Sequence, residues 1–443
     1  MTSIHTIFAL STPPGVGALA VVRLSGPAAQ AAGQKLSQKT DFLPRQAVRV
    51  MLRDPETGAA IDDGIAIYFP APNSFTGEDV MELTLHGGRA TTQGLLTALG
   101  KMPGLRLAEP GEFTRRAFEN NKMDLTQAEA IADLIHAETV QQRTQALSQL
   151  SGTLRDLYHG WADRLAALLA HAEADIDFAD EDLPPDIIAA QQAQIEQLIA
   201  ELQNHLSDNH RGERLRDGVT IAIVGAPNAG KSTLLNALAQ RDVAIVTDIA
   251  GTTRDVLEVH LDLGGWPVTL LDTAGLRETT DAIESEGIRR ARARAEHADL
   301  KLCLFDSGAE PDKATRDLID ENAIVVVTKC DQKRDENFPP LASRLSFLSA
   351  HTAAGIPELL AAIKTRLEKI FYQSRETPSL TRARHRAALE ESLAALQRAA
   401  TANLPELRAE DLRLALRALG RITGRVDVED LLDRIFADFC IGK

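Results

Sequence analysis

The strongest constraint on the fold is a short stretch near the middle of the chain. Residues 225–232 read Gly-Ala-Pro-Asn-Ala-Gly-Lys-Ser, a complete phosphate-binding loop. The apolar run Val219–Val224 precedes it, and the residues from Thr233 onward have helical spacing. Between a strand and a helix, such a loop turns its backbone N–H groups toward phosphates; Lys231 neutralises the β and γ oxygens, and the Ser232 hydroxyl reaches Mg²⁺. The sequence therefore predicts an α/β nucleotide-binding domain rather than a Gly-rich structural turn.

A second strand end supplies the residues expected around the γ-phosphate. The apolar run Val268–Leu271 leads into Asp272-Thr273-Ala274-Gly275. A carboxylate at a strand end reaches the Mg²⁺ shell, and a glycine lets a backbone N–H approach the phosphate closely. Many GTPases place a glutamine directly after this motif, whereas this chain has Leu276, so another residue must orient the attacking water.

Two later elements favour guanine over adenine. The apolar run Ala323–Val327 leads into Thr328-Lys329-Cys330-Asp331, and the Asp331 carboxylate accepts two N–H groups that a guanine edge offers and adenine does not. Ser349-Ala350 is predicted to receive the guanine carbonyl. Together the four elements resemble the translation-factor-like GTPase superfamily. The usual guanine motif begins with asparagine, so Thr328 predicts a weaker bond to the phosphate loop, with guanine selectivity retained and nucleotide affinity lowered.

The composition of the chain indicates where the protein works and which kinds of partner it can attract. The chain has 443 residues and a formal net charge of −15, so it has no bulk attraction for nucleic acid. It has no run of 18 apolar residues and no basic-then-apolar N-terminal leader, which predicts no membrane span. Cys303, Cys330 and Cys440 show no paired spacing, which indicates reduced thiols and a cytoplasmic location.

Local basic character is confined to the C-terminal stretch. Its arginines either form a solvated helix face or contact RNA, and the sequence does not choose between the two. They are Arg382, Arg384, Arg386, Arg398, Arg408, Arg413, Arg417, Arg421 and Arg425.

The pattern along the chain predicts a multidomain fold. Residues 1–120 alternate short apolar runs with turns and predict an α+β domain. Amphipathic helical segments follow over residues 121–214, with a linker at 211–218, and helical periodicity resumes over 372–443. We expect one discontinuous all-α domain into which an α/β P-loop GTPase domain, residues 215–371, is inserted.

Two tempting motifs are set aside. Gly15-Val-Gly-Ala-Leu-Ala20 matches a dinucleotide fingerprint, but Val21-Val-Arg-Leu reads as strand, so the helix that binds pyrophosphate is missing. Cys440 stands near Lys443 and could be a nucleophile, but a lone cysteine among Phe436, Phe439 and Ile441 is more typical of a small buried hydrophobe.

Motifs outside the nucleotide domain carry a more specific resemblance. They include Thr12–Gly15, Val21–Gly26, Ala71–Asp79, His86–Gly88, Pro110–Thr114, Lys122–Ala130, Ile249–Asp255 and Phe439–Lys443. Over essentially its full length the chain resembles the tRNA-modification GTPases of the MnmE (TrmE) family.

The resemblance implies a homodimer that works with a flavoprotein, MnmG (GidA), in a heterotetramer or larger complex on tRNA. It implies that a carboxymethylaminomethyl or aminomethyl-type group is added to C5 of the wobble uridine, with 5-formyl- or 5,10-methylene-tetrahydrofolate as one-carbon donor. The implied N-terminal domain binds folate and forms the dimer. Its folate contacts correspond to Arg23, Glu82, Lys122 and Lys443.

The resemblance also implies how GTP is hydrolysed. K⁺ is held by Asn228, Thr247, Ile249 and Thr252, and Mg²⁺ by Ser232 and Thr253, while Glu284 is the general base and Lys231 the catalytic cation. K⁺-dependent pairing of two GTPase domains switches hydrolysis on. The GTP-binding residues are then Asn228, Ala229, Gly230, Lys231, Ser232, Thr233, Thr247, Asp248, Ile249, Ala250, Gly251, Thr252, Thr253, Asp272, Thr273, Ala274, Gly275, Thr328, Lys329, Asp331, Ser349 and Ala350.

Two other classes of function were weighed against this one. A ribosome-assembly GTPase would carry a KH-type domain or tandem GTPase domains, and the sequence shows one phosphate loop with a helical C-terminal flank. A folate-binding regulator without catalysis would have no need of Lys231, Ser232, Asp272 and Gly275 together.

Overall fold

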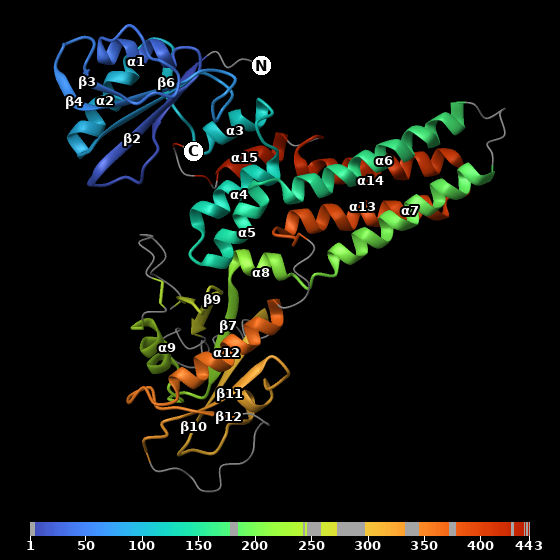
Figure 1. Ribbon diagram of the computed structural model, residues 1–443. Helices are drawn as coiled ribbons and strands as arrows, with labels where there is room; N and C mark the ends of the chain where they lie inside the picture. Colours follow the sequence, from blue (N-terminus) through green and yellow to red (C-terminus); the bar gives the residue numbers. More distant parts are fainter. Residues whose placement is uncertain are drawn as a thin grey trace, which may run out of the picture. The chain divides into compact units, whose positions relative to one another are not determined.

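A computed structural model describes residues 5–177, 185–241, 244–245, 258–272, 297–332, 345–371, 378–426, 429–437, 439 and 442. The chain divides into two compact units. The first contains residues 1–132, 149–166 and 416–443, and the second contains residues 133–148 and 167–415. The architecture is multidomain: an N-terminal α+β part, helices in two separate stretches of sequence, and an α/β P-loop part between those stretches (Figure 1).

The first unit begins with a six-stranded sheet in the order β3-β4-β5-β2-β1-β6. Neighbouring strands are antiparallel except β1 and β6, which are parallel. Alternating side chains such as Val22, Leu24, Leu83 and Leu85 are fully buried, and they form one core with apolar residues of the helices α1 and α2. The bounds are β1 Thr6–Leu10, β2 Gly17–Ser25, β3 Val48–Arg53, β4 Ala60–Phe69, β5 Val80–Gly87, β6 Leu105–Leu107, α1 Ala29–Ser37 and α2 Arg89–Gly100.

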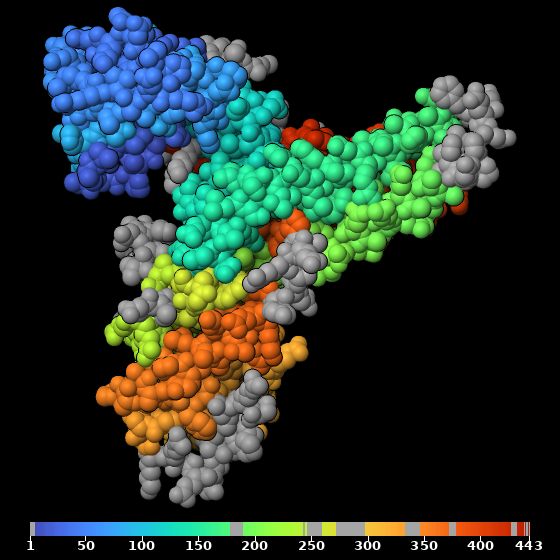
Figure 2. Space-filling view, in the orientation of Figure 1, coloured from blue at the N-terminus to red at the C-terminus, as the bar shows by residue number. Residues whose placement is uncertain are grey.

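This part confirms that the dinucleotide fingerprint is a false match. Residues 17–25 continue as strand β2 where a dinucleotide site would need a helix. In Figure 2 the surface of this sheet and its helices α1 and α2 is coloured in shades of blue.

A buried ion-pair network fixes the loop 71–79 against the sheet. The Arg116 guanidinium, only 5% exposed, donates to Glu78 at 2.9 Å and to Glu112 at 2.9 Å. Arg116 and Glu112 belong to helix α3, Glu112–Glu119, and Glu78 lies in the loop. Each of these buried charges has an opposite partner. Removing one partner would leave an uncompensated buried ion, so the ion pairs hold the helix and the loop together.

The remaining helices fall on either side of the P-loop part in sequence. Apolar side chains on α7, including Ile195, Leu198 and Leu202, are buried, and α7 packs against α13 (Figure 1). None of the described helices has the length and apolar character needed to cross a membrane. The bounds are α4 Leu125–His136, α5 Val140–Leu150, α6 Thr153–Asp177, α7 Pro185–Leu206, α8 Arg211–Asp217, α13 Ala383–Thr401, α14 Pro405–Thr423 and α15 Glu429–Ala437.

The segment 211–218, expected to be a linker, is largely helical as α8. Gly212 lies against the carbonyl of Leu380, so that an added Cβ would come within 1.9 Å of that oxygen. The Arg211 side chain donates to Ser379 Oγ at 2.9 Å. The chain therefore enters and leaves the P-loop part along two segments in contact with each other, and only glycine permits this approach.

A single carboxylate joins the two segments to α4. Asp133 Oδ1 accepts from Arg216 Nε at 2.9 Å and from Arg382 Nη2 at 2.7 Å. Several other C-terminal arginines also pair with carboxylates: Arg386 with Asp208 and Glu213, Arg398 with Asp411, Arg413 with Glu173 and Glu410, and Arg425 with Asp163. Of the two alternatives for this basic stretch, a solvated helix face or a contact with RNA, the pairing with carboxylates favours the helix face.

The P-loop part contains a second six-stranded sheet, in the order β12-β11-β10-β7-β9-β8. All neighbours are parallel except β8 and β9. The strands are nearly continuous apolar runs; Cys303 on β10 is fully buried, as expected of a core residue. The bounds are β7 Val219–Gly225, β8 Glu258–Asp262, β9 Pro267–Asp272, β10 Leu300–Asp306, β11 Ala323–Thr328, β12 Leu345–Phe347, α9 Lys231–Ala239, α11 Lys313–Arg316 and α12 Ile356–Phe371.

We expect the helices around His205 to lose stability in mild acid. Burial lowers the pKa of His205 from 6.5 to about 4, which outweighs the opposite effect of Asp208. Between these two pH values the unfolded chain binds a proton that the folded chain does not, so the free energy of unfolding falls as the pH drops through this window, by up to about 3 kcal/mol. Hydrogen exchange in α7 and α13 at pH 7 and pH 5 measures the loss, and His205→Gln should reduce it. An unchanged pH dependence in that variant would contradict the prediction.

Candidate functional site

The phosphate-binding loop lies between β7 and α9. Asn228 and Gly230 have positive φ angles of 64° and 90°, which bend the loop back toward the start of the helix. Lys231, the first residue of α9, is buried, and its Nζ donates to the carbonyls of Gly225 at 2.7 Å and Ala226 at 2.9 Å. The ammonium group is thus held over the loop, where it can meet the phosphate oxygens that the helix N-terminus also attracts.

The parallel register brings other strand ends to the same edge of the sheet. Asp272 pairs with Ile223 at the end of β9, and Leu304 on β10 pairs with Gly225. Asp306 and Thr328, which end β10 and β11, pair with each other. This is the edge at which ligands bind in open α/β sheets.

Part of the predicted site lies outside the residues that the structure describes. This applies to Thr247, Asp248, Ile249, Ala250, Gly251, Thr252, Thr253, Thr273, Ala274, Gly275, Leu276, Glu284, Cys440 and Lys443.

Thr328 makes the bond that the sequence had put in doubt. Its side chain is 2% exposed, and its hydroxyl donates to the Ala229 carbonyl at 2.7 Å and approaches the Phe305 carbonyl at 3.2 Å. A hydroxyl has one hydrogen, so the shorter contact takes most of it. The phosphate loop and the base loop are therefore joined by a threonine hydroxyl where an asparagine amide usually does this.

We expect Thr328→Val to raise the Kd for GDP about tenfold, because it removes the hydroxyl without changing the side-chain shape and leaves the buried Ala229 carbonyl without this donor. Thr328→Ser keeps the donor and should stay within about twofold of the unchanged protein. Calorimetric titration with GDP measures both. Equal affinities for the valine and serine variants would show that the bond does not support the site.

Two of the residues predicted to select guanine, Asp331 and Ser349, also meet. The Ser349 hydroxyl donates to the Asp331 carboxylate, and this bond, with backbone N–H donation, holds the pKa of Asp331 below its usual value. Ser349 is buried, and its backbone N–H donates to the Ala354 carbonyl at 2.9 Å. The ionised Asp331 carboxylate beside the turn at Ser349 can accept two N–H groups from one edge of a base, while the turn can meet a carbonyl on the same base.

In the N-terminal part, Arg23 and Glu82 form a pair across β2 and β5. The two residues are register partners, and Arg23 Nε donates to Glu82 Oε1 at 2.9 Å. Both side chains are partly exposed, and the guanidinium carbon of Arg23 lies 5.5 Å from the centre of the Phe75 ring. A carboxylate, a guanidinium and an aromatic ring that are all accessible suit a planar heterocycle with N–H groups and a carboxylated tail.

Lys122 contacts the same loop that carries Phe75. Its Nζ donates to the Pro72 carbonyl at 3.0 Å, and its side chain packs beside Gly77. The C-terminus also approaches this sheet, because Ser11 Oγ donates to the Gly442 carbonyl at 3.0 Å. The structure thus brings Arg23 and Lys122 to the loop 71–79, and it pairs Glu82 with Arg23 on the sheet. Phe75, beside Arg23, was not among the predicted site residues, although it lies within a motif, Ala71–Asp79, that the sequence had singled out.

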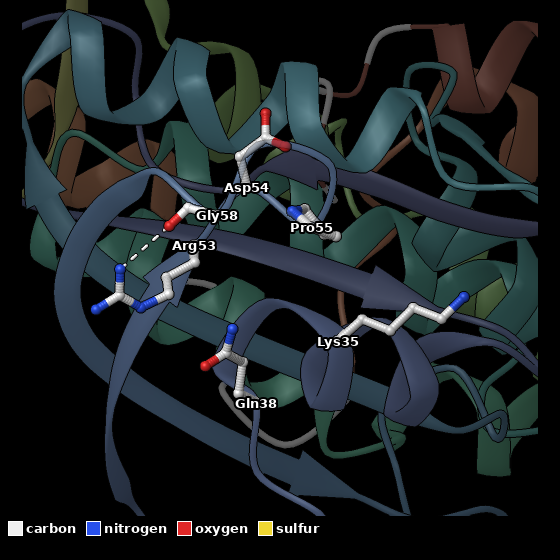
Figure 3. Close-up of a pocket in the computed structure, with 6 residues that line it drawn as sticks. All are labelled: Lys35, Gln38, Arg53, Asp54, Pro55 and Gly58. Atoms are coloured by element: carbon white, nitrogen blue, oxygen red, sulfur yellow. Dashed lines mark hydrogen bonds between the residues drawn. The ribbon is translucent and has the colours of Figure 1, made fainter.

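A cavity of about 410 Å³ lies elsewhere in this part, lined by Lys35, Gln38, Arg53, Asp54, Pro55 and Gly58. The Arg53 guanidinium donates to the Gly58 carbonyl at 3.1 Å. Figure 3 shows the charged ends of Lys35 and Arg53 pointing away from each other. Two cationic side chains that point apart do not bind one small anion together. The sheet edge beside the phosphate loop is therefore the better-formed candidate site.

Comparison with known proteins decides the family. The profile of the MnmE helical domain matches residues 125–440, and that of the GTP-binding protein TrmE N-terminus matches residues 6–122. The tRNA modification GTPase MnmE of Parvibaculum lavamentivorans is 56% identical over 443 residues, covering 99% of this chain and 100% of the relative. The chain belongs to the MnmE family. The MnmE of Rhodospirillum rubrum is 54% identical over 460 residues and covers 100% of both chains.

Solved structures were also found to be similar to part of this MnmE family member. The G domain of the T. maritima iron transporter FeoB is 24% identical and covers 34% of this chain and 98% of that one, with a TM-score of 0.24. Membership of the MnmE family confirms the resemblance found in the sequence, and the element order confirms the expected fold class, with an inserted P-loop part.

Proposed function

We propose that this chain is the GTP-hydrolysing subunit of a complex that modifies C5 of the wobble uridine (U34) in tRNA, adding a carboxymethylaminomethyl or aminomethyl-type group. The observation that carries the proposal is the meeting of phosphate-loop and guanine-selective residues at one sheet edge, in a chain that matches tRNA modification GTPases over its whole length. The domain limits 1–120, 121–214, 215–371 and 372–443 are part of the proposal.

Within that site, Lys231 and the loop N–H groups would hold the phosphates, and Asp331 with Ser349-Ala350 would select guanine. Ser232 and Thr253 offer hydroxyl oxygens of the kind that Mg²⁺ prefers. Asn228, Thr247, Ile249 and Thr252 offer side-chain and backbone oxygens suited to K⁺. These residues would hold a monovalent cation, which would supply positive charge toward the phosphates, the role an arginine finger has elsewhere. Glu284 would accept the proton of the attacking water. Leu276, at the position where many GTPases have a glutamine, cannot hydrogen-bond that water.

The N-terminal part would bind the one-carbon donor, a reduced folate. Glu82 suits the N–H groups of the pterin, while Arg23, Lys122 and Lys443 suit the carboxylates of the glutamate tail. The accessible Arg23–Glu82 pair beside Phe75 supports this assignment. We further propose a cytoplasmic homodimer that binds the flavoprotein MnmG and tRNA.

The test is GTP turnover by the purified protein in K⁺ and in Na⁺, with ATP as the comparison substrate. We expect turnover about tenfold faster or more in K⁺, because one correctly placed positive charge stabilises the transition state by more than 1 kcal/mol. Adding the flavoprotein, reduced folate and unmodified tRNA should then yield a modified wobble uridine by mass spectrometry of the digested tRNA.

Each outcome of this experiment tests a different part of the proposed function. Equal turnover of ATP would contradict guanine selection, and equal rates in K⁺ and Na⁺ would contradict the cation site. GTP turnover with no change in the tRNA would contradict the modification role while leaving the GTPase intact.

A further inference from the structure

Asp306 and Lys329 form an ion pair beside the guanine-selective loop. Lys329 Nζ lies 2.7 Å from Asp306 Oδ2, and the Gly308 N–H donates to the other carboxylate oxygen at 3.0 Å. Burial opposes ionisation of Asp306, but the bonds from Lys329 and Gly308 prevail and lower its pKa. The side chains of Asp306 and Lys329 are 26% and 32% exposed, so the pair borders the surface where a nucleotide would lie.

The backbone of Lys329 is tied to the same strand end. Lys329 has a φ of 56°, in the left-handed region that a residue with a side chain seldom adopts. Ser307 Oγ donates to the Lys329 carbonyl at 3.0 Å, and the Ser307 N–H donates to the Thr328 carbonyl at 3.1 Å. The end of β10 therefore holds Lys329 at both its main chain and its ammonium group.

Lys329 directly follows Thr328, whose hydroxyl bonds the phosphate loop, and it lies two positions before Asp331. A lysine stem can cover an apolar ring face while its charged end is held elsewhere. A free lysine side chain loses rotamer freedom when a ligand fixes it. A lysine already fixed by an aspartate has lost that freedom before the ligand arrives, which favours tighter binding.

We infer that Asp306 is a positioning residue for the guanine nucleotide, acting through Lys329. The inference rests on the proposed GTP-binding function and extends it to a residue outside the loop motifs. Because the pair lies beside the base loop, it supports guanosine di- and triphosphates alike. Asp306 sets how long the nucleotide stays bound, and Asp331 sets which base is accepted.

The test is the dissociation rate of a fluorescent GDP from the full-length protein. Asp306→Ala should raise this rate about tenfold, since a charge-assisted bond is lost. Asp306→Asn, which keeps an acceptor for the Gly308 N–H, should give a smaller rise. The preference for GDP over ADP should stay unchanged in both variants. In a Lys329→Met background, Asp306→Ala should add almost nothing, because the two residues act as one unit.

Asp320→Asn is the matched control, since Asp320 pairs with Lys301 at 2.5 Å at the other end of β10. It should leave the rate unchanged. A rate within twofold of the unchanged protein in both Asp306 variants, additive effects with Lys329→Met, or an equal rise in Asp320→Asn would each overturn the inference. Failure of the unchanged protein to bind GDP at all would instead contradict the proposed function.

Discussion

Asp331→Asn is expected to lower the affinity for GTP about a hundredfold and to raise the affinity for xanthosine triphosphate, because a site built to hydrogen-bond one base edge rejects an edge with the wrong donors. The Asp331 carboxylate only accepts, which suits the two N–H groups of guanine. An asparagine amide accepts once and donates once, which suits the N–H and carbonyl of xanthine. Ser349 can still contact the amide, so the loop geometry is retained.

Competition between the two triphosphates for a fluorescent GDP measures the change. Glu321→Gln, which also removes one negative charge, from an exposed residue in the turn just before β11, serves as the control and should bind as the unchanged protein does. Loss of affinity for both triphosphates alike, with no gain for xanthosine, would mean that Asp331 supports the fold of the loop and does not read the base.

Lys231→Ala is expected to lower kcat/KM for GTP about a thousandfold, since the lysine both binds the β and γ oxygens and offsets charge in the transition state. The fold should survive, because the two carbonyls that accept from Lys231 lie in a loop next to the surface and can bond water instead. Steady-state hydrolysis with circular dichroism on the same sample separates lost chemistry from lost structure.

Lys369→Ala removes the same charge from the exposed side of α12 and provides the comparison. Its turnover should match that of the unchanged protein. Hydrolysis by the Lys231 variant within about threefold of normal would remove the phosphate loop from the proposed mechanism.

Local sequence signals predicted much of this fold. The α+β pattern expected of residues 1–120 is present, because alternating apolar residues between turn residues need no distant information. The phosphate loop was equally predictable, since strand, loop and helix are contiguous. The helix α8 was missed because its charged, Gly-containing sequence looks like a linker, and the reason for Gly212 lies in its contact with Leu380, far along the chain.

Pairings between residues far apart in the chain could not be predicted from the sequence. The Asp306–Lys329 pair depends on the parallel register of β10 and β11, and the Arg23–Glu82 pair on the antiparallel register of β2 and β5. The bond from Thr328 to Ala229 depends on three strand ends meeting at one edge. Counting charges also could not show that several of the C-terminal arginines pair with carboxylates distant in the sequence.

The pairing of α7 with α13 sets a condition on how the protein is made. Helix α7 ends at Leu206 and its partner begins at Ala383, with the whole nucleotide part between them. At the usual rate of translation, α7 therefore leaves the ribosome on the order of ten seconds or more before α13 exists. During that interval Ile195, Leu198 and Leu202 have no α13 to cover them, while the nucleotide part can already fold. We therefore expect a growing chain of this protein to expose an apolar helix face for that interval, which is the kind of surface that chaperones bind.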